Sequence, residues 1–477
     1  MQYRFLFSLI FILFILAFEQ GCRSRKDVPN ILIILTDQWR YQAAGYAGDP
    51  NVRTPHLDQL AAGSANFKNA VSGLPVCTPN KASLLTGQRP LTNGVFMNDV
   101  LLDTNAVTLA KVLAKNNYQT AFIGKWHLDG QYRLSYTPPG NRRQGFQYWK
   151  AVNCDHDYNH SLYYDNNDTS RHYWQGYDVI AETQDAKKYI HEHANGQKPF
   201  FLMLSLGAPH NPYNTAPEKY RRMYDSSKLV LLPNVPDNMR LKAGSALAGY
   251  YAHISAIDEM VGELLAELKQ SNILDNTIIL FTSDHGDLLG SHGYFRKQQP
   301  YNESIKVPML FYYHGTDSII SGRYASMFNT EDIMPTLLGV AGIKIPSSVE
   351  GTSFSGYMQG RFDQPKDTVA LITCVQPFGE WARGNGGKEY RGVCTPNYTY
   401  ARDLKGPWLL FDNKNDPYQL NNLIGNPLYA SLQAHFDTLL NKELKQTKDE
   451  FLPGPVYVSR FHYPDLDSTG TVPYFLK

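Results

Sequence analysis

The 477-residue sequence predicts an α/β protein: a large, doubly wound, mostly parallel sheet flanked by helices, with a smaller C-terminal α+β domain. The main observation is a set of short apolar runs, each suited to a strand that is buried on both faces of a parallel sheet. These runs lie at 31–35, 118–124, 199–206 and 277–282. Helical patterns precede them, for example at 108–115 and 178–193, and this alternation is typical of a parallel sheet covered by helices.

The length exceeds what one hydrophobic core usually serves, which predicts two domains, a large one over 28–360 and a C-terminal one over 361–477. We expect the longest helix over 246–270, because apolar side chains recur there every three or four residues. A last helix is expected near 426–444. The stretch 131–177 is rich in aromatic and basic residues without a sustained period, and is interpreted as a long functional excursion.

The N-terminus has the pattern of an export signal. Arg4 is followed by an apolar stretch over 5–18, too short for a comfortable membrane span, so we expect a signal peptide over 1–21 and an exported protein. The pair Gly21-Cys22 resembles the lipobox of bacterial lipoproteins, in which the cysteine is lipidated. The expected location is therefore the periplasm or, with a lipid on Cys22, the surface of a bacterial membrane.

The charge balance argues against nucleic acid as a partner. The chain has 45 Lys and Arg against 44 Asp and Glu, a formal net charge of +1, so any anion must be bound by local groups. Three further cysteines are Cys154, Cys374 and Cys394. Either all three are buried thiols, or Cys374 and Cys394 form a disulfide, and both alternatives stay open.

Polar side chains follow each of the apolar runs. They are Asp37 and Gln38 after the first, Lys125 and His127 after the second, His210 after the third, and Asp284 and His285 after the fourth. In open α/β sheets ligands bind at the carboxyl edge of the strands, so these distant residues are expected to share one crevice. A lone aspartate at a strand end more often caps a helix. Two Asp-containing pairs favour a hard or borderline divalent cation instead.

A short helix is predicted to begin at Cys77. Pro79 suits its first turn and Gly87 its C-terminal end. Cys77 would then lie where unpaired backbone N–H groups and the helix dipole favour an anion. Without further observations a buried thiol would be the simpler interpretation.

The segment Cys77-Thr78-Pro79-x-Lys81-x-Ser83-Leu84-Leu85-Thr86-Gly87 resembles the signature of the type I sulfatases of the alkaline phosphatase superfamily, in which the cysteine is oxidised to formylglycine. Other segments resemble the family in the same order, from about Pro29 to Leu423. They are Pro29 to Gln38, Gly124-Lys125-Trp126-His127, Ala208-Pro209-His210, Ser283-Asp284-His285-Gly286, Lys297 to Pro308, Leu410-Phe411-Asp412 and Asp416-Pro417.

The resemblance implies a nucleophile at residue 77, because hydrated formylglycine carries two hydroxyls, one to attack sulfur and one to expel sulfate later. It also implies a formylglycine-generating maturation enzyme as a partner. It further implies one divalent metal ion, with Ca²⁺ favoured and Mn²⁺ as the alternative. The implied metal ligands are Asp37, Gln38, residue 77, Asp284 and His285.

The remaining implied roles belong to cations and imidazoles. Lys125 and Lys297 would hold the sulfuryl oxygens. His210 would donate a proton to the leaving alcohol and His127 would act as base, although these two roles could be exchanged. The family normally has arginine where Lys81 stands, and lysine keeps the charge but loses the planar fork.

The substrate expected from the excursion is a sulfated carbohydrate, with Arg142, His156 and His160 among the side chains suited to contact a sugar. Two rival functions stay open. Gln38 and His285 replace the family's commoner aspartate and asparagine, as in subgroups that include phosphonate monoester and phosphodiester hydrolases. The other rival is a catalytically impaired protein that binds sulfated glycans. The sugar, the sulfated position and exo or endo action are not determined by the sequence.

Overall fold

The structure, a computed structural model, describes residues 28–363 and 369–477. The predicted signal peptide over 1–21 and Cys22 lie outside the described residues. Within the described ranges, no helix combines the length and the apolar character that a membrane crossing requires.

The described residues form a large sheet in the order β10-β2-β9-β8-β1-β7-β3-β4-β5-β6. Its strands are β1 (Asn30–Asp37), β2 (Ala65–Val71), β3 (Gln119–Lys125), β4 (Tyr148–Val152), β5 (Leu162–Asp165), β6 (His172–Tyr173), β7 (Phe200–Pro209), β8 (Thr277–Ser283), β9 (Met309–Tyr312) and β10 (Gly322–Asn329). The centre is parallel, since β1 pairs in parallel with both β7 and β8, and β3 with β7. The strands β9, β5 and β6 pair antiparallel. The four apolar runs are thus confirmed as β1, β3, β7 and β8.

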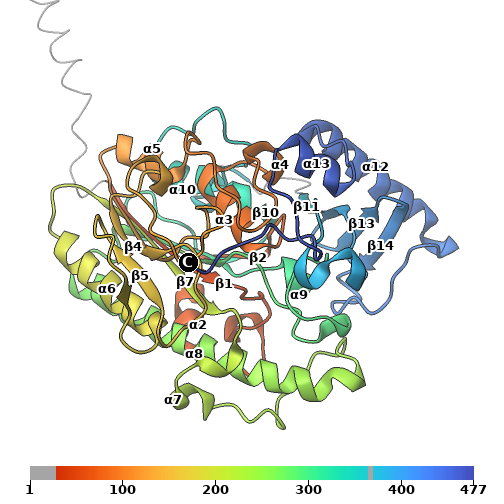
Figure 1. The fold of residues 1–477 in the computed structure, drawn as a ribbon, viewed down its shortest axis with the longest axis horizontal. Coiled ribbons are helices and arrows are strands. Elements are labelled where there is room, and N and C mark those ends of the chain that lie inside the picture. Colours follow the sequence, from red (N-terminus) through yellow and green to blue (C-terminus); the bar gives the residue numbers. More distant parts are fainter. Residues whose placement is uncertain (1–27, 364–368) are drawn as a thin grey trace, which may run out of the picture.

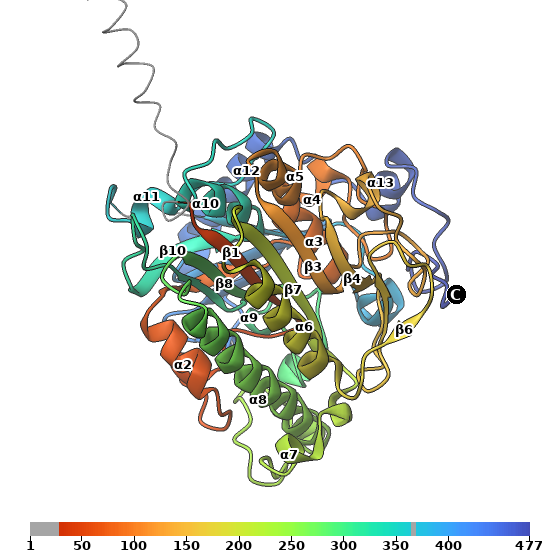
Figure 2. The same cartoon turned by 90° about the vertical axis from the view of Figure 1, so that its left-hand side faces the viewer.

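Helices cover both faces of this sheet (Figures 1 and 2). They are α2 (Pro55–Ala62), α3 (Cys77–Thr86), α4 (Pro90–Asn93), α5 (Leu109–Lys115), α6 (Asp178–His193), α7 (Glu218–Arg221), α8 (Arg240–Gln270), α9 (Asn302–Ile305), α10 (Ile333–Val340) and α11 (Ser355–Met358). Alternate residues of β1 face opposite ways, as the two-residue period of a strand requires. Ile31 and Ile33 pack in one core with α3, α5 and α10, whereas Leu32 and Ile34 pack in another with α2, α6 and α8.

The predicted helices are confirmed, most of them with ends shifted by a few residues. Thr108 caps α5 through its side chain, α6 has the predicted bounds, and α3 begins at Cys77 and ends before Gly87, whose φ is 63°. The helix α8 begins at Arg240, earlier than the predicted 246, because its first turns lie at an exposed end and lack the apolar period. Leu241 there is 91% exposed.

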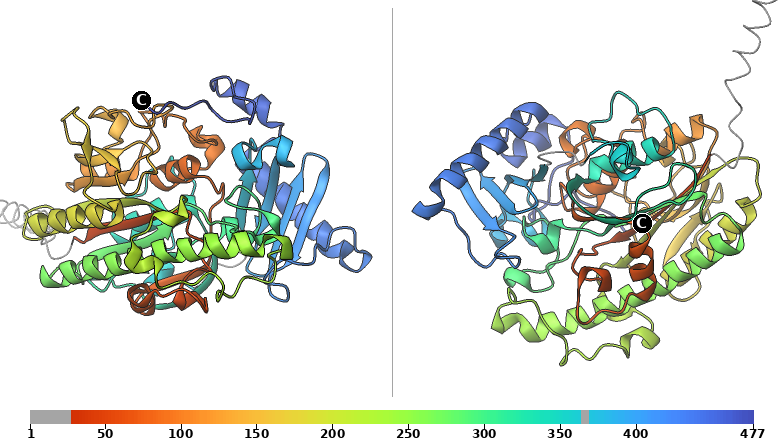
Figure 3. Two further views of the ribbon diagram at one scale, coloured as in Figure 1. Left: turned by 60° about the horizontal axis from the view of Figure 1, so that its bottom comes forward. Right: turned by 180° about the vertical axis from the view of Figure 1, so that it is seen from behind.

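A second, antiparallel sheet forms the smaller C-terminal part, set beside the large sheet in Figure 3. It contains β11 (Ala370–Cys374), β12 (Tyr390–Cys394), β13 (Tyr398–Asp403) and β14 (Gly406–Asp412), followed by α12 (Ala430–Thr447) and α13 (Gly454–Arg460). Phe436 and Leu440 of α12 pack on Val393 and Tyr400 of the sheet. The predicted domain boundary at residue 360 stays a prediction.

Cys374 and Cys394 do not form the disulfide that was one of the two alternatives. Both are buried free thiols, as is Cys154. In the β11–β12 pair, Cys394 lies opposite Ala370 and Cys374 lies opposite Tyr390, so the two sulfurs sit at opposite ends of the pair.

The excursion over 131–177 is more regular than its composition suggested, because it contains β4, β5 and β6 at one edge of the large sheet. Several of its rings serve the core. Trp149 stacks on Phe122 and meets Trp126 edge to face. Strands this short leave little periodicity to detect, which explains why the sequence of this excursion shows no sustained period.

The C-terminal segment after α13 runs back across the large domain (Figures 1 and 3). Phe475 forms a parallel bridge with Tyr132 and stacks on its ring. This return brings residues near 470 to the same side as the ends of β1 and β3.

We predict that Gly124→Ala destabilises the protein by about 2–5 kcal/mol. Gly124 has φ 102° in β3, and a Cβ there would collide with the backbone carbonyl of Ser205 on β7. Gly176→Ala is the matched control, because Gly176 also has a positive φ, 73°, but open space around it. The control should cost only about 1–2 kcal/mol of backbone strain. Equal losses in urea denaturation would contradict the close strand packing at Gly124.

Candidate active site

Four buried ligand groups converge at the carboxyl edge of the large sheet. Asp37 ends β1, Asp284 and His285 follow β8, and Cys77 begins α3. One ligand atom from each lies within 4.8 Å of the others. The predicted meeting of Asp37 with Asp284 is confirmed, because parallel strands end at the same edge.

The chemistry of this cluster suits a divalent cation. Nδ1 of His285 lies 2.9 Å from the carbonyl oxygen of Gly286, which fixes the proton on Nδ1 and leaves Nε2 free as a ligand. That Nε2 lies 3.4 Å from an oxygen of Asp37 and 3.4 Å from an oxygen of Asp284. Burial and the neighbouring Asp37 raise the pKa of Asp284 to about 6. A cation would offset this repulsion between carboxylates.

The side-chain amide of Gln38 adds an oxygen donor to this set, and a hydrogen bond fixes its orientation. Its Nε2 donates to Asp287 at 2.7 Å, and the Tyr213 hydroxyl donates to the same carboxylate oxygen. This contact orients the Gln38 amide so that Oε1 has no hydrogen-bond partner within the described structure. Among the described residues, Gln38 Oε1 and Asp284 Oδ2 are buried without a hydrogen-bond partner. Two such oxygens beside the cluster fit a hard cation, so the residues present suit the metal that the resemblance implies.

Cys77 lies among positive charges. Nζ of Lys297 lies 3.0 Å from its sulfur and 2.9 Å from Nε2 of His285. Burial and Asp37 raise the pKa of the Cys77 thiol, but Lys297 and Lys125 outweigh them, and the pKa falls to about 6. The surroundings therefore stabilise negative charge at residue 77.

Lys125, at the end of β3, forms a buried ion pair with Asp37 at 2.6 Å. Burial raises the pKa of Asp37, but Lys125 and the neighbouring cations hold it well below its usual range. Nζ of Lys125 also lies 3.2 Å from Nε2 of His156. Lys81 is buried one turn after Cys77 on α3, with Nζ 3.5 Å from the carbonyl oxygen of Lys125.

His127 is held by a carboxylate that the sequence analysis did not identify. Its Nε2 lies 3.3 Å from Asp99, and Asp99 also accepts two hydrogen bonds from Arg133, at 2.7 and 2.8 Å. In the described structure Nδ1 of His127 has no hydrogen-bond partner. Asp99 follows no strand and belongs to no quoted motif, so only the fold brings it here.

The cluster opens into a pocket of about 600 Å³. Its walls include Cys77, Lys125, His127, His156, His210 and Lys297. The imidazoles of His156 and His210 stack with centroids 4.5 Å apart, and Nδ1 of His210 donates to the carbonyl oxygen of Asn211 at 2.7 Å. Burial lowers the pKa of His210 well below its usual value.

Of the three residues expected to contact a sugar, only His156 lines this pocket. Arg142 pairs with Asp129 at 2.6 Å, and His160 stacks on Tyr173 on the outer part of the excursion. The pocket rim instead comes from the C-terminal segment, including Asp467, Thr469 and Tyr474. Arg133 lies 3.4 Å from the centre of the Tyr474 ring. No periodicity or motif marks this segment, so sequence reasoning had no signal for it.

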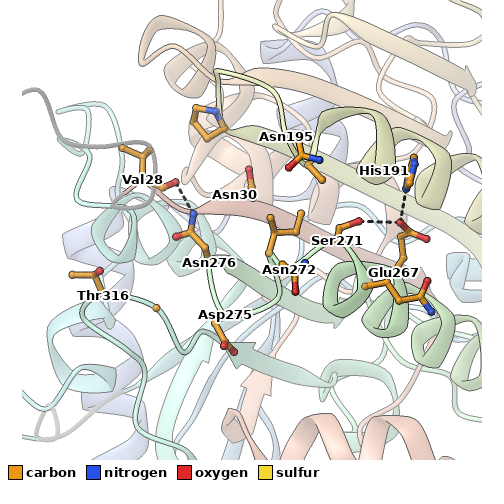
Figure 4. A pocket seen from close by; sticks show the side chains of 15 residues that line it. Val28, Asn30, His191, Asn195, Glu267, Ser271, Asn272, Asp275, Asn276 and Thr316 are labelled. Atoms are coloured by element: carbon orange, nitrogen blue, oxygen red, sulfur yellow. Dashed lines mark hydrogen bonds and ion pairs between the residues drawn. The ribbon is translucent and has the colours of Figure 1, made fainter.

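A second hollow of about 600 Å³ lies at the opposite edge of the sheet, near the start of β1 (Figure 4). Val28, Asn30 and Glu267 are among its lining residues, and Glu267 binds His191 and Ser271. Its walls include no cysteine or lysine and no convergent set of ligands, so it does not compete with the Cys77 pocket as the candidate active site.

Comparison with known proteins agrees with this geometry. Residues 29–343 match the family model Sulfatase, and residues 290–448 match the model described as N-sulphoglucosamine sulphohydrolase, C-terminal. An ulvan-active sulfatase of Formosa agariphila is 45% identical over 449 residues, covering 94% of this chain and 87% of that protein. An endo-4-O-sulfatase of Bacteroides thetaiotaomicron is 32% identical, with coverages of 85% and 91%.

The fold comparison gives the same result. A crystal structure from Bacteroides fragilis described as a sulfatase superposes with a TM-score of 0.82 at 31% identity, covering 90% of this chain and 98% of that one. This chain belongs to the sulfatase family, the enzymes that hydrolyse sulfate esters. The family generally uses a formylglycine and a divalent metal ion.

We predict that a divalent cation stabilises the metal-free protein. Ca²⁺ or Mn²⁺ added after chelation should raise the thermal unfolding temperature, by the equivalent of about 2.7 kcal/mol at 100 times the dissociation constant. Asp284→Asn should abolish most of this shift. Asp185→Asn, which removes a carboxylate that binds Lys150 outside the cluster, should keep it. An unchanged shift in Asp284→Asn would place the cation elsewhere.

Proposed function

We propose that this sulfatase removes sulfate from a carbohydrate, with formylglycine made from Cys77 as nucleophile. The observation that carries the proposal is the position of Cys77, at the amino-terminal end of α3 and 3.0 Å from Lys297, within the buried group of Asp37, Asp284 and His285. The carbohydrate substrate is supported by the names of the similar proteins, an ulvan-active sulfatase and an endo-4-O-sulfatase.

The reaction starts at the hydrated aldehyde of residue 77. One hydroxyl attacks sulfur, the S–O bond to the sugar breaks, and the sugar leaves as an alcohol once its oxygen gains a proton. The second hydroxyl then loses its proton, the aldehyde C=O forms again, and sulfate leaves; water rehydrates the aldehyde. When bound, the divalent cation supplies Lewis acidity that offsets charge on the sulfuryl oxygens. Asp37, Gln38, Asp284 and His285 would hold it.

Lys125 and Lys297 provide fixed positive charge for the sulfuryl group. Burial lowers the pKa of Lys297, but Cys77, Asp37 and Asp284 outweigh burial and raise it. The two carboxylates remain after Cys77 is converted and continue to favour the charged ammonium. Both ammonium groups are held by anionic neighbours before substrate arrives. Such preorganised charges need no reorganisation during the reaction.

His210 is suited to protonate the leaving alcohol. Its Nδ1–H donates a hydrogen bond to the Asn211 carbonyl, so Nε2 is the ring nitrogen available to protonate the leaving oxygen. Burial keeps the free imidazole neutral, and the negative charge of an entering sulfate ester favours its protonated form. His127 is suited to take the proton from the second hydroxyl in its deprotonated form, because Asp99 then holds Nε2–H and the lone pair is on Nδ1.

Maturation and location complete the proposal. Oxidation of Cys77 needs a formylglycine-generating enzyme in the same host, and Lys81 must serve in place of the family's usual arginine. We propose export through the segment 1–21, to the periplasm or to a lipid anchor at Cys22. The metal we favour is Ca²⁺, because the donors are mainly oxygen atoms.

The proposal predicts an aldehyde at residue 77. Mass spectrometry of the peptide that contains residue 77, from protein made in the native host, should show a loss of about 18 Da relative to cysteine, as the chemistry of thiol-to-aldehyde conversion requires. Purified protein should hydrolyse an aryl sulfate faster than the matching aryl phosphodiester, and Cys77→Ala should abolish turnover. An unmodified thiol together with full activity would overturn the nucleophile assignment, and preference for the phosphodiester would overturn the substrate class.

Asp99→Asn should lower kcat by about 100-fold or more while leaving KM for an aryl sulfate nearly unchanged. Burial lowers the pKa of His127, but Cys154 and the hydrogen bond to Asp99 outweigh burial and raise it. A base works above its pKa. Losing the carboxylate lowers that pKa, so the acidic limb of the kcat profile should move to lower pH. A limb that does not move would assign Asp99 a purely structural role.

A further inference from the structure

A further hollow, distinct from the one in Figure 4, adjoins the active-site pocket. It has a volume of about 770 Å³ and lies between α7, the amino-terminal half of α8 and the segment around residue 295. The helices α7 and α8 lie side by side (Figure 1). Arg296 lines both hollows, so the two spaces are adjacent. We call the hollow between α7 and α8 the cationic groove and define it by Tyr213, Arg221, Lys242, Phe295 and Arg296.

The groove has an unbalanced charge. Arg221, Lys242 and Arg296 line it, and none of its lining residues is a carboxylate. Arg296 has a partner in Glu380 at 2.8 Å, which lines the active-site pocket instead. Arg221 and Lys242 are exposed and form no ion pair with any described residue. On a protein of net charge +1, such a group of unpaired cations is a local feature.

Neighbouring cations on the same helix are neutralised, which sets the groove apart. Lys219 binds Glu259 at 2.7 Å, and Arg222 binds Glu218 at 2.5 Å. Of the basic residues from 219 to 222, only Arg221 lines the groove. The chain thus pairs Lys219 and Arg222, which do not line the groove, and leaves Arg221, which does, available for an external anion.

Aromatic rings provide apolar surface between the cations. Phe295 is half-buried, and Nζ of Lys242 lies 4.6 Å from its ring centre. The Tyr213 ring is fixed by the hydrogen bond from its hydroxyl to Asp287. Rigid rings beside cations suit a ligand that combines a sugar face with negative charge.

We propose that the cationic groove is a second anion-binding subsite for the substrate. It binds a further sulfated or carboxylated sugar of the same chain whose sulfate ester occupies the Cys77 pocket. The proposal rests on the proposed carbohydrate sulfatase function. It means that the substrate is an anionic oligosaccharide or polysaccharide, because a single sugar cannot fill both spaces.

The test compares two charge-matched double variants. Arg221→Gln with Lys242→Gln removes the unpaired cations of the groove, whereas Lys219→Gln with Arg222→Gln removes the same charge from the paired cations nearby. The substrates are size-fractionated ulvan oligosaccharides, short and long, and an aryl sulfate too small to reach the groove. The measured quantity is kcat/KM on each oligosaccharide fraction divided by kcat/KM on the aryl sulfate.

The wild type should prefer the long fraction. The groove variant should lose about three- to tenfold of the long-chain ratio through a higher KM, as expected for two exposed charge contacts. The paired-cation variant should keep the wild-type ratio. No length preference in the wild type, or equal losses in the two variants, would overturn the subsite.

A direct binding measurement distinguishes failure of the proposed subsite from failure of the proposed sulfatase function. Calorimetry measures the affinity of each variant for dextran sulfate of high and of low molecular mass, with neutral dextran as control. This affinity does not depend on turnover. Weaker binding of the large polyanion by the groove variant than by the paired-cation variant supports the subsite, even if ulvan is not hydrolysed. Equal binding by both variants overturns it, even if aryl sulfate is hydrolysed and the enzyme class stands.

Discussion

The buried ion pair between Asp37 and Lys125 is the interaction on which the site depends. Both side chains are almost completely excluded from water, and removing either charge would be strongly destabilising because the other would lose its nearest partner. The pair joins the ends of β1 and β3, which are separated by β7 in the sheet. It therefore ties the end of β1, where the buried ligand cluster lies, to the end of β3, where Lys125 lines the pocket.

Around this pair, each reactive group is oriented by a neighbour that does not itself react. Asp287 turns the amide of Gln38, Asp99 holds His127, and the Gly286 carbonyl fixes the proton of His285. Such contacts limit the rotamers of the ligands before metal and substrate bind. The precision of the site thus comes from hydrogen bonds made by loop residues around it, some of which follow strands, whereas Asp99 does not.

The walls of the pocket have a different origin from its floor. The floor includes Cys77 at the start of α3 and Lys125 at the end of β3, whereas the rim includes residues of the excursion after β3 and of the C-terminal segment near Tyr474. A rigid floor suits a reaction that every sulfate ester shares. A rim built from loops can differ among relatives without disturbing it, so selectivity for the alcohol part of the substrate is expected to reside there and in the cationic groove.

The sequence by itself predicted the parallel sheet, the helix beginning at Cys77 and the meeting of Asp37 with Asp284 and His285 at one edge. These features depend on the spacing of apolar residues, on the residue types at helix ends and on the rule that parallel strands end at one edge of the sheet. The first two are local properties of the sequence, and the third follows from the sheet topology. Only the tertiary structure decided that Asp99, Arg133 and Tyr474 reach the pocket while Arg142 and His160 do not. These positions follow from how loops pack over the sheet. The contacts that place them, such as those of Arg133 with Asp99 and with Tyr474, join separate loop segments and leave no periodic trace in the sequence.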